Sequence, residues 1–230
     1  DVYKRQIYYF CTMITLAEEN YLKAILSISL NEDGKVSTNA IANEIGTSAA
    51  SVSDMLKKLG EKKLIKYEKY KGVELSKLGQ NKAVMILRKH RLWETFLVNK
   101  LDFNWGEVHD VAEQLEHIQS SELIDRLDIF LEHPKFDPHG EPIPNKEGKI
   151  ASTNTTPLNE LQVNTKGKIM GVSLDEKDFL DYLTKLNITI GTEVILIEKV
   201  SFDKSLSIKI ENTKQHISND VAKHLLIKIS

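Results

Sequence analysis

The sequence contains little of what marks several classes of protein. Cysteine occurs once, at Cys11, so an internal disulfide framework is excluded and a reducing, cytoplasmic location is expected. No stretch approaches the roughly 18 consecutive apolar residues of a membrane-spanning helix, which argues against a membrane partner. Basic residues number 31 and acidic residues 33, so attraction to nucleic acid would have to come from a local patch.

Residues 1–12 are expected to be a leader that is not native or not ordered. This tract does not begin with Met, whereas Met13 opens a segment with the character of a natural start. The apolar stretch at 7–10 is too short for the core of a signal peptide, and no small-residue cleavage motif follows it. Without the leader, the native chain would contain no cysteine.

The first third of the chain predicts one helix followed by a helix-turn-helix pair. Thr15 is a candidate N-cap of the first helix. The apolar residues of that helix recur at helical spacing: Leu16, Tyr21, Leu22, Ile25, Leu26 and Ile28. Residues 37–39 open a short second helix that Gly46 ends, and Ser48 caps a third that runs to about Leu59. Two short helices joined by a tight turn with glycine are typical of a helix-turn-helix.

A hairpin is expected directly behind this pair, from the runs 64–67 and 73–75, where it would form a wing. The second helix of the pair would enter the major groove with its N-terminal residues against the bases. The candidate DNA-binding residues are Thr47, Ser48, Ala50, Ser51, Ser53, Asp54, Lys57, Lys69 and Lys71. The side chains on the helix are mostly small and hydroxylated, so we expect modest direct readout and some dependence on DNA shape.

Lysine is concentrated around this hairpin. Residues 57–71 contain seven lysines against two glutamates, a local charge of +5 in a chain whose net charge is −2. Solvated helices also carry lysines, but the order helix, turn, helix and hairpin favours a phosphate-binding surface.

The remainder of the chain predicts a helical part and then a β-rich part. Long or paired helices are expected at 76–101, 106–118 and 120–131, and the Pro-, Gly- and His-rich segment 133–157 is typical of a connection. The expected strands are Lys168–Val172, Glu193–Lys199, Leu206–Ile210 and Leu225–Ile229, with one helix at 176–186. A small barrel of roughly 70 residues is the natural interpretation.

Histidine and glutamate recur at one-turn spacing on two of the expected helices. His90 and Glu94 share a face of the long helix. The helix at 106–118 places a further set within a narrow arc: His109, Glu113, Glu116 and His117. Imidazole and carboxylate donors without thiolate suit Mn, Fe, Zn or Co. An ordinary amphipathic surface helix has the same appearance, so the pattern alone leaves both interpretations open.

Several strings resemble the diphtheria toxin repressor family of metal-dependent regulators, including its manganese-sensing branch. They are AEENYLKAI at 17–25, SVSDMLKKL at 51–59, YEKYKG at 67–72, KHRLWE at 89–94, VHDVAEQLEH at 108–117 and DPHGEPIP at 137–144. The resemblance extends over nearly everything from Met13 onward. It implies a homodimer that binds palindromic double-stranded operator DNA when loaded with Mn(II) or Fe(II), and represses metal-uptake genes.

The same resemblance implies a fold that is mainly α with a β-rich C-terminal domain. The expected domains are a winged helix-turn-helix at 13–76, a helical metal-binding and dimerisation domain at 77–145, a linker at 146–157 and an SH3-like, FeoA-like domain at 158–230. The implied primary metal site consists of Asn20, Glu113, Glu116 and His117. The implied second site consists of His90, Glu94 and His109, with Glu176 as a further candidate.

Four positions differ from the patterns of the family. Iron-sensing members usually have Cys and Met where this chain has Glu113 and Asn20, and the exchange of sulfur for oxygen favours Mn(II). Manganese-sensing members without the extra domain usually have acidic residues at the positions of Asn20 and Lys23, and a protonated lysine at 23 argues against their paired-ion cluster. Phe179 stands where iron-type members have a glutamine that can ligate.

Two other hypotheses come from different classes of protein. One is a winged-helix regulator that is not gated by metal. The other is a metallohydrolase that uses the same histidines and glutamates. It carries little weight, because the chain has no H-E-x-x-H motif, Gly-rich loop or evident nucleophile motif, and we therefore expect no enzyme.

Overall fold

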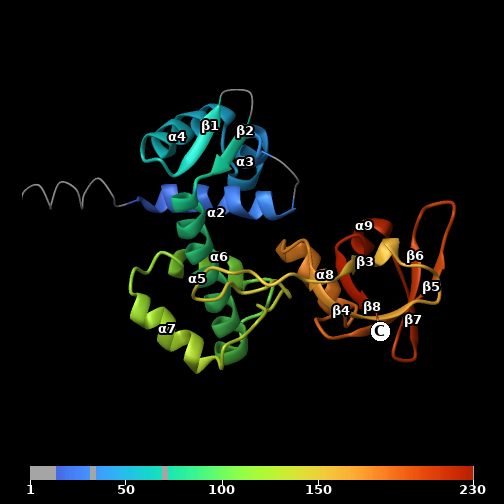
Figure 1. The fold of residues 1–230 in the computed structure, drawn as a ribbon. Helices are drawn as coiled ribbons and strands as arrows, with labels where there is room; N and C mark the ends of the chain where they lie inside the picture. The colour runs from blue at the N-terminus through green and yellow to red at the C-terminus, as the bar shows by residue number, and fades with distance from the viewer. Residues whose placement is uncertain (1–13, 32–34, 69–71, 230) are drawn as a thin grey trace, which may run out of the picture. The chain divides into compact units, whose positions relative to one another are not determined.

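The computed structural model describes residues 14–31, 35–68 and 72–229. Cys11, Lys69 and Lys71 lie outside the described residues. The chain forms two compact units (Figure 1). The first contains the described residues up to Lys89, together with Glu116–Ile118 and Pro144–Gly148. The second contains His90–Leu115, Gln119–Ile143 and the described residues from Lys149 onward.

The first unit begins with three helices whose ends are set by local side chains. They are α2 (Leu16–Asn31), α3 (Thr38–Ile45) and α4 (Ala49–Glu61). Thr15 and Glu18 form a capping box at the start of α2, because each side chain accepts a hydrogen bond from the other residue's backbone N–H. Ser37 and Ser48 cap α3 and α4, and Gly46 ends α3 with a left-handed φ of 70°. The caps at Thr15, at 37–39 and at Ser48 and the stop at Gly46 were predicted, whereas the part of Glu18 in the capping box was not.

These helices and a hairpin enclose one apolar core. Strands β1 (Ile65–Glu68) and β2 (Gly72–Leu75) pair antiparallel, and Val36 adds an isolated bridge to Val73. The largest fully buried side chains of this part are Leu22, Ile25, Ile41, Leu56, Leu59 and Leu64. The first unit therefore contains a winged helix-turn-helix, as the order of elements predicted.

Three further helices follow: α5 (Lys77–Leu101), α6 (Val108–Leu115) and α7 (Ser121–Phe130). Helix α6 is shorter than predicted and ends at Leu115. Glu116 and His117 lie in the turn beyond it, so the prediction that they share a helix face with His109 and Glu113 is wrong. The period of 3.6 residues gives the facing of side chains only while the helix continues.

The segment that follows α7 is more than a connection. Phe136 and Pro142 form an isolated β-bridge, and Asp137, His139 and Ile143 between or beside them are buried. The composition of this segment, rich in Pro, Gly and His, predicted a linker here. Buried polar side chains instead bring this stretch into the site.

The C-terminal part is a six-stranded antiparallel sheet in the order β3-β8-β4-β5-β6-β7. Its elements are β3 (Thr156–Pro157), a 3-10 turn (Leu158–Glu160), β4 (Lys166–Val172), α8 (Lys177–Lys185), β5 (Glu193–Lys199), β6 (Leu206–Ile210), β7 (Thr213–Ile217), α9 (Asn219–Ala222) and β8 (Leu225–Ile229). The four predicted strands and α8 are present. Strand β7 was missed because only Ile217 in it is buried, which leaves little hydrophobic pattern.

Candidate metal centre

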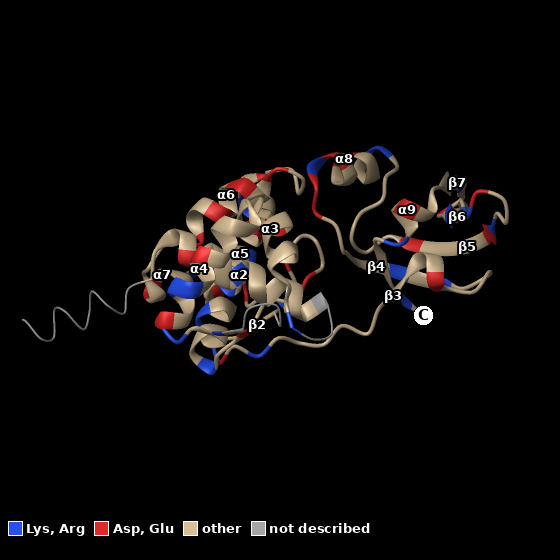
Figure 2. Cartoon of the chain, turned by 90° about the horizontal axis from the view of Figure 1, so that it is seen from above, with Lys and Arg blue, Asp and Glu red and all other residues tan. Residues whose placement is uncertain are grey.

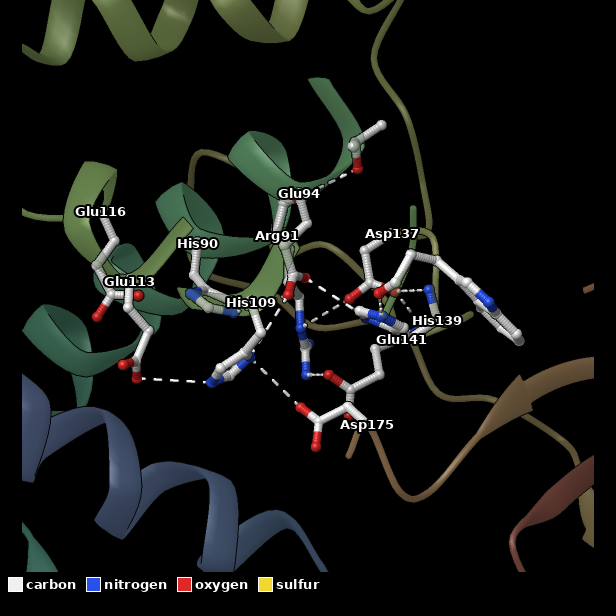
Figure 3. Close-up of polar contacts among 12 residues, drawn as sticks. His90, Arg91, Glu94, His109, Glu113, Glu116, Asp137, His139, Glu141 and Asp175 are labelled. Atoms are coloured by element: carbon white, nitrogen blue, oxygen red, sulfur yellow. Dashed lines mark hydrogen bonds and ion pairs between the residues drawn. The ribbon is translucent and has the colours of Figure 1, made fainter. Parts of the chain in front are cut away.

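The first candidate cluster joins α5 to α6. His90 Nε2 lies 3.0 Å from Glu94 Oε1, and His109 Nδ1 lies 3.7 Å from the same oxygen. The two imidazole rings meet edge to face at 4.9 Å. One donor atom from each residue falls within 4.8 Å of the others, so this predicted trio could hold a divalent ion (Figure 3).

Two more carboxylates reach His109 (Figure 3). Glu113 Oε1 lies 3.6 Å from Nε2, and Asp175 Oδ2 lies 3.5 Å from Nδ1. Asp175 was missed, since Glu176 beside it was the sequence candidate from the C-terminal domain. The structure places Glu176 at the exposed N-cap of α8. Asp175, and not Glu176, is therefore the carboxylate that lies next to His109.

A second cluster shares Glu94 and was not predicted. His139 Nδ1 lies 3.7 Å from Glu94 Oε2, and donor atoms of Glu94, Asp137 and His139 again fall within 4.8 Å of one another. His139 Nε2 lies 2.8 Å from the carbonyl oxygen of Trp105. Donation of the Nε2 hydrogen to that carbonyl leaves Nδ1 to face Glu94, which is the orientation expected of a metal-binding histidine.

Asp137 is fixed from two sides. Its Oδ1 accepts the backbone N–H groups of His139 and Glu141, both at 2.9 Å. Its Oδ2 is buried and has no hydrogen-bond partner among the described residues, although Arg91 Nε lies 3.5 Å away. Arg91 also contacts Glu141 at 2.5 Å and donates to the carbonyl of Pro142 at 2.7 Å. A buried arginine therefore ties this segment to α5.

The charges in these clusters perturb one another. Burial would raise the pKa of Glu94, but His90 and contacts from His109 and His139 hold it well below its usual range. Glu113 and Glu94 raise the pKa of His109 to about 10. Burial, with the carboxylates of Glu94 and Glu141, raises the pKa of Asp137 to about 7. Strong coupling of this kind is common at functional sites.

The third cluster lies in the first unit, between α2 and the turn after α6. Glu116 Oε2 lies 2.8 Å from Lys23 Nζ, and Glu116 is fully buried. Glu19 Oε2 lies 2.6 Å from His117 Nδ1. Asn20 Oδ1 is buried without a hydrogen-bond partner in the described part of the chain. Glu113, the fourth residue implied for this site, belongs to the second unit.

The donor chemistry of all three clusters suits a hard divalent cation. Carboxylate, amide and imidazole groups are the donors, and the buried amide oxygen of Asn20 is a group that a cation could coordinate. Acidic residues of α6 are red in Figure 2. Metal ions therefore fit the residues that the chain presents.

The candidate DNA surface is largely exposed. On and before α4, Ser48, Ala50, Ser51, Asp54 and Lys57 are exposed, while Thr47 and Ser53 are half-buried. Several of these polar groups already have local partners. Ser48 accepts from the backbone of Ser51, Ser53 Oγ donates to the carbonyl of Ala49, and Asp54 pairs with Lys57 at 2.9 Å.

Models of three known domains match successive parts of this chain. Residues 13–73 match the N-terminal DNA binding domain of iron dependent repressors, residues 76–145 their metal binding and dimerisation domain, and residues 156–229 the FeoA domain. The iron-dependent repressor IdeR of Mycobacterium leprae is 30% identical over 181 residues, which cover 74% of this chain and 78% of that protein. The chain belongs to the iron-dependent repressor family.

The chain is also similar to a solved structure and to part of a longer protein. A solved structure titled "Manganese-dependent transcriptional repressor complex with manganese" is 31% identical, with a TM-score of 0.86, over 93% of this chain and 100% of that one. A 75-residue stretch is 44% identical to a "Probable metal transport system membrane protein" of Chlamydia trachomatis, of which it spans only 17%.

Membership of the iron-dependent repressor family settles the general activity. The chain is a metal-dependent, DNA-binding transcriptional repressor of the diphtheria toxin repressor type, with Mn or Fe as the fitting cofactor. Members are repressors and not enzymes, so the hydrolase hypothesis is set aside. No helix in the described ranges is long and apolar enough to cross a bilayer.

Proposed function

We propose that this repressor responds to Mn(II) in preference to Fe(II), and that it controls metal-uptake genes from the cytoplasm by binding palindromic operators as a homodimer. The observation that carries the metal preference is the donor set. Glu113 and Asn20 contribute oxygen, and none of the clusters described above contains sulfur. The manganese-loaded repressor of similar structure supports this preference.

For the first site we propose Asn20, Glu116 and His117 as ligands, and Glu113 remains a candidate from the sequence alone. When bound, a divalent ion supplies a positive charge to which the oxygen and nitrogen donors coordinate together. Asn20 lies on α2, which also contributes Leu22 and Ile25 to the core of the DNA-binding part. Donors on α2 that are held to the turn at Glu116 and His117 would limit how α2 moves.

For the second site we propose Glu94 as the central ligand, because its two oxygens face different partners. His90 and His109 lie against Oε1, and His139 lies against Oε2 beside Asp137. Asp175 replaces Glu176 as the proposed ligand from the C-terminal domain, since it reaches His109. His109→Ala and His139→Ala, compared in Mn(II) stoichiometry by equilibrium dialysis, show which donors bind the ion.

The proposed gating is a shift between populations. Half-sites on a palindromic operator require the two DNA-binding parts of a dimer to be held at a fixed separation. Ligands that coordinate one ion favour one arrangement of α2. The metal binds that arrangement more tightly and so raises its population. DNA contact would come from Thr47, Ser48, Ala50, Ser51, Ser53, Asp54 and Lys57 on the helix, with Lys69 and Lys71 from the wing.

The decisive experiment tests metal-dependent DNA binding. Fragments are first selected from a random library with Mn(II)-loaded protein and then used in gel shifts with Mn(II), Fe(II), Zn(II) or chelator. Asn20→Ala should weaken Mn(II)-dependent binding by at least tenfold while unfolding near the wild-type temperature. Gln114→Ala, an exposed amide on α6, is the control and should bind normally. Wild-type affinity that is the same with metal and with chelator contradicts the proposal.

Dimerisation has a candidate surface in the second unit. Exposed apolar side chains gather at the end of α5, beyond it and on α7: Leu101, Phe103, Leu123, Ile129 and Phe130. We propose that a second copy covers them, in agreement with the dimerisation domain matched here. Phe130→Glu should yield monomers in analytical ultracentrifugation, whereas Phe202→Glu, at an exposed phenylalanine in the C-terminal part, should not. A dimeric Phe130→Glu protein would refute this surface.

A further inference from the structure

Two ion pairs engage two of the metal-binding groups of the first site. The ammonium of Lys23 lies 2.8 Å from Glu116 Oε2, and Glu19 Oε2 lies 2.6 Å from His117 Nδ1. Lys23 and Glu19 flank Asn20 on α2, one on each side along the helix. The side chain of Lys23 is only 11% exposed and that of Glu116 is fully buried. This contact is therefore shielded from water and from salt screening.

A second lysine contributes to the balance of charge. Lys89 on α5 donates to the carbonyl of Ile118 at 3.4 Å. Burial lowers the pKa of Lys89, while the carboxylates of Glu19 and Glu116 oppose that shift, so both carboxylates lie near it. Two lysines thus lie near the two carboxylates of this cluster, and a divalent ion added to it would meet both ammonium groups.

We infer that Lys23 is an internal competitor of the metal, whose ammonium holds Glu116 Oε2 and must move away before that oxygen can ligate. The inference rests on the proposed first site and adds what sets its sensitivity. Glu116 Oε2 cannot hold the ammonium at 2.8 Å and also coordinate a cation, because both need the same oxygen. Oε1 lies 4.0 Å from His117 Nε2, and a cation between those two atoms would share the carboxylate with the ammonium, which repels it. Lys23 therefore raises the metal concentration at which the repressor loads.

The ion pair between Lys62 and Glu18 provides a matched control. Lys62 Nζ also lies 2.8 Å from a buried glutamate of α2, Glu18, whose other contacts form the capping box with Thr15. Glu18 is outside the proposed donor set. Replacement of Lys62 therefore removes a lysine–glutamate ion pair of the same length without affecting a proposed metal ligand. Replacement of Lys23 removes such a pair at a proposed metal ligand.

The experiment uses the full chain, stripped of metal with a chelator. Lys23→Met, Lys23→Arg and Lys62→Met are compared with wild type in a Glu94→Gln background, which removes the carboxylate central to the second site. Mn(II) affinity is measured by calorimetry and by competition with a chelator of known affinity, and thermal unfolding is recorded with and without Mn(II). The competition assay remains usable for a variant that folds only when Mn(II) is present.

Lys23→Met should bind Mn(II) at least tenfold more tightly, which corresponds to about 1.4 kcal/mol. Its metal-free Tm should fall, because Glu116 loses its buried partner, and its Tm with saturating Mn(II) should approach that of wild type. Lys23→Arg keeps the charge and should stay within about threefold of wild type. Lys62→Met should lower the Tm in both conditions and leave the affinity unchanged.

Three other results would contradict the competitor role of Lys23. Unchanged or weaker Mn(II) binding by Lys23→Met overturns the competitor role and leaves the proposed function intact. Equal tightening by Lys62→Met also overturns it, because general charge would then be the cause. If wild type and every variant bind no Mn(II), the proposed first site and the competitor role fail together.

Discussion

Arg91 is the residue whose replacement tests most directly how the buried centre is built. Arg91→Met removes a guanidinium that is 6% exposed and lies 3.5 Å from Asp137, whose side chain is fully buried. Breaking a buried ion pair from one side costs about 3–5 kcal/mol. The lost hydrogen bond to the carbonyl of Pro142 belongs to the charged class worth about 1.5–3 kcal/mol. The contact with Glu141 adds under about 1 kcal/mol, because that carboxylate is 48% exposed.

These contributions overlap and cannot simply be added. Asp137 can also take up a proton, which reduces the cost of losing its cationic partner. We therefore expect the free energy of unfolding to fall by about 3 kcal/mol near neutral pH. Urea denaturation of the metal-free protein, followed by circular dichroism, measures it. Arg126→Met is the control: its ion pair with Glu122 is 2.7 Å long but both side chains are about three-quarters exposed, and the loss should stay below about 0.5 kcal/mol. A loss under 1 kcal/mol for Arg91→Met would refute the reasoning.

The effect should also depend on pH. Because the pKa of Asp137 is raised to about 7, above its unfolded value, its contribution favours folding at low pH and is lost as the pH rises through 7. Removal of Arg91 raises that pKa further. The deficit of Arg91→Met should therefore be larger at pH 8 than at pH 6, and Asp137→Asn in the same chain should remove the difference.

Further predictions concern the stability of the framework at four positions. Ser48→Ala should destabilise the protein by about 1 kcal/mol in thermal unfolding, because the N-cap of α4 is lost, and Ser48→Asn should restore most of it. Gly140→Ala should cost about 3 kcal/mol or more, since its Cβ would lie 1.9 Å from the carbonyl oxygen of Met170 at a φ of +85°. Gly46→Ala, with open space around it, should cost only about 1 kcal/mol. Leu180→Ala, fully buried in α8, should lower stability by about 2–5 kcal/mol.

The parts of the fold that local chemistry determines were predictable. The caps at Ser37 and Ser48 and the glycine stop at Gly46 act within a few residues, so the sequence shows them directly. The end of α6 at Leu115 was not predictable in the same way, because Glu116 and His117 continue the helical pattern although the helix has stopped. Helix ends without a capping motif depend on tertiary contacts.

The candidate site was predictable where ligands share a helix and obscure where they come from irregular segments. His90 and Glu94 are one turn apart on α5, and that spacing alone brings them together. Asp137 and His139 lie in a segment whose composition indicated a linker, and contacts with residues distant in the sequence, among them the buried Arg91, hold it in place. Asp175 and Glu176 are adjacent carboxylates, and no rule of spacing selects between them.

The placement of Trp105 gives this protein an internal optical probe. Its ring stacks on the imidazole of His139 with centroids 6.1 Å apart, and its carbonyl accepts the hydrogen bond that orients that histidine. The chain contains two tryptophans, and the other, Trp93, is buried on α5. A Trp93→Phe protein would therefore emit from a single indole beside His139, and changes in the charge of that imidazole would be recorded as quenching of its emission.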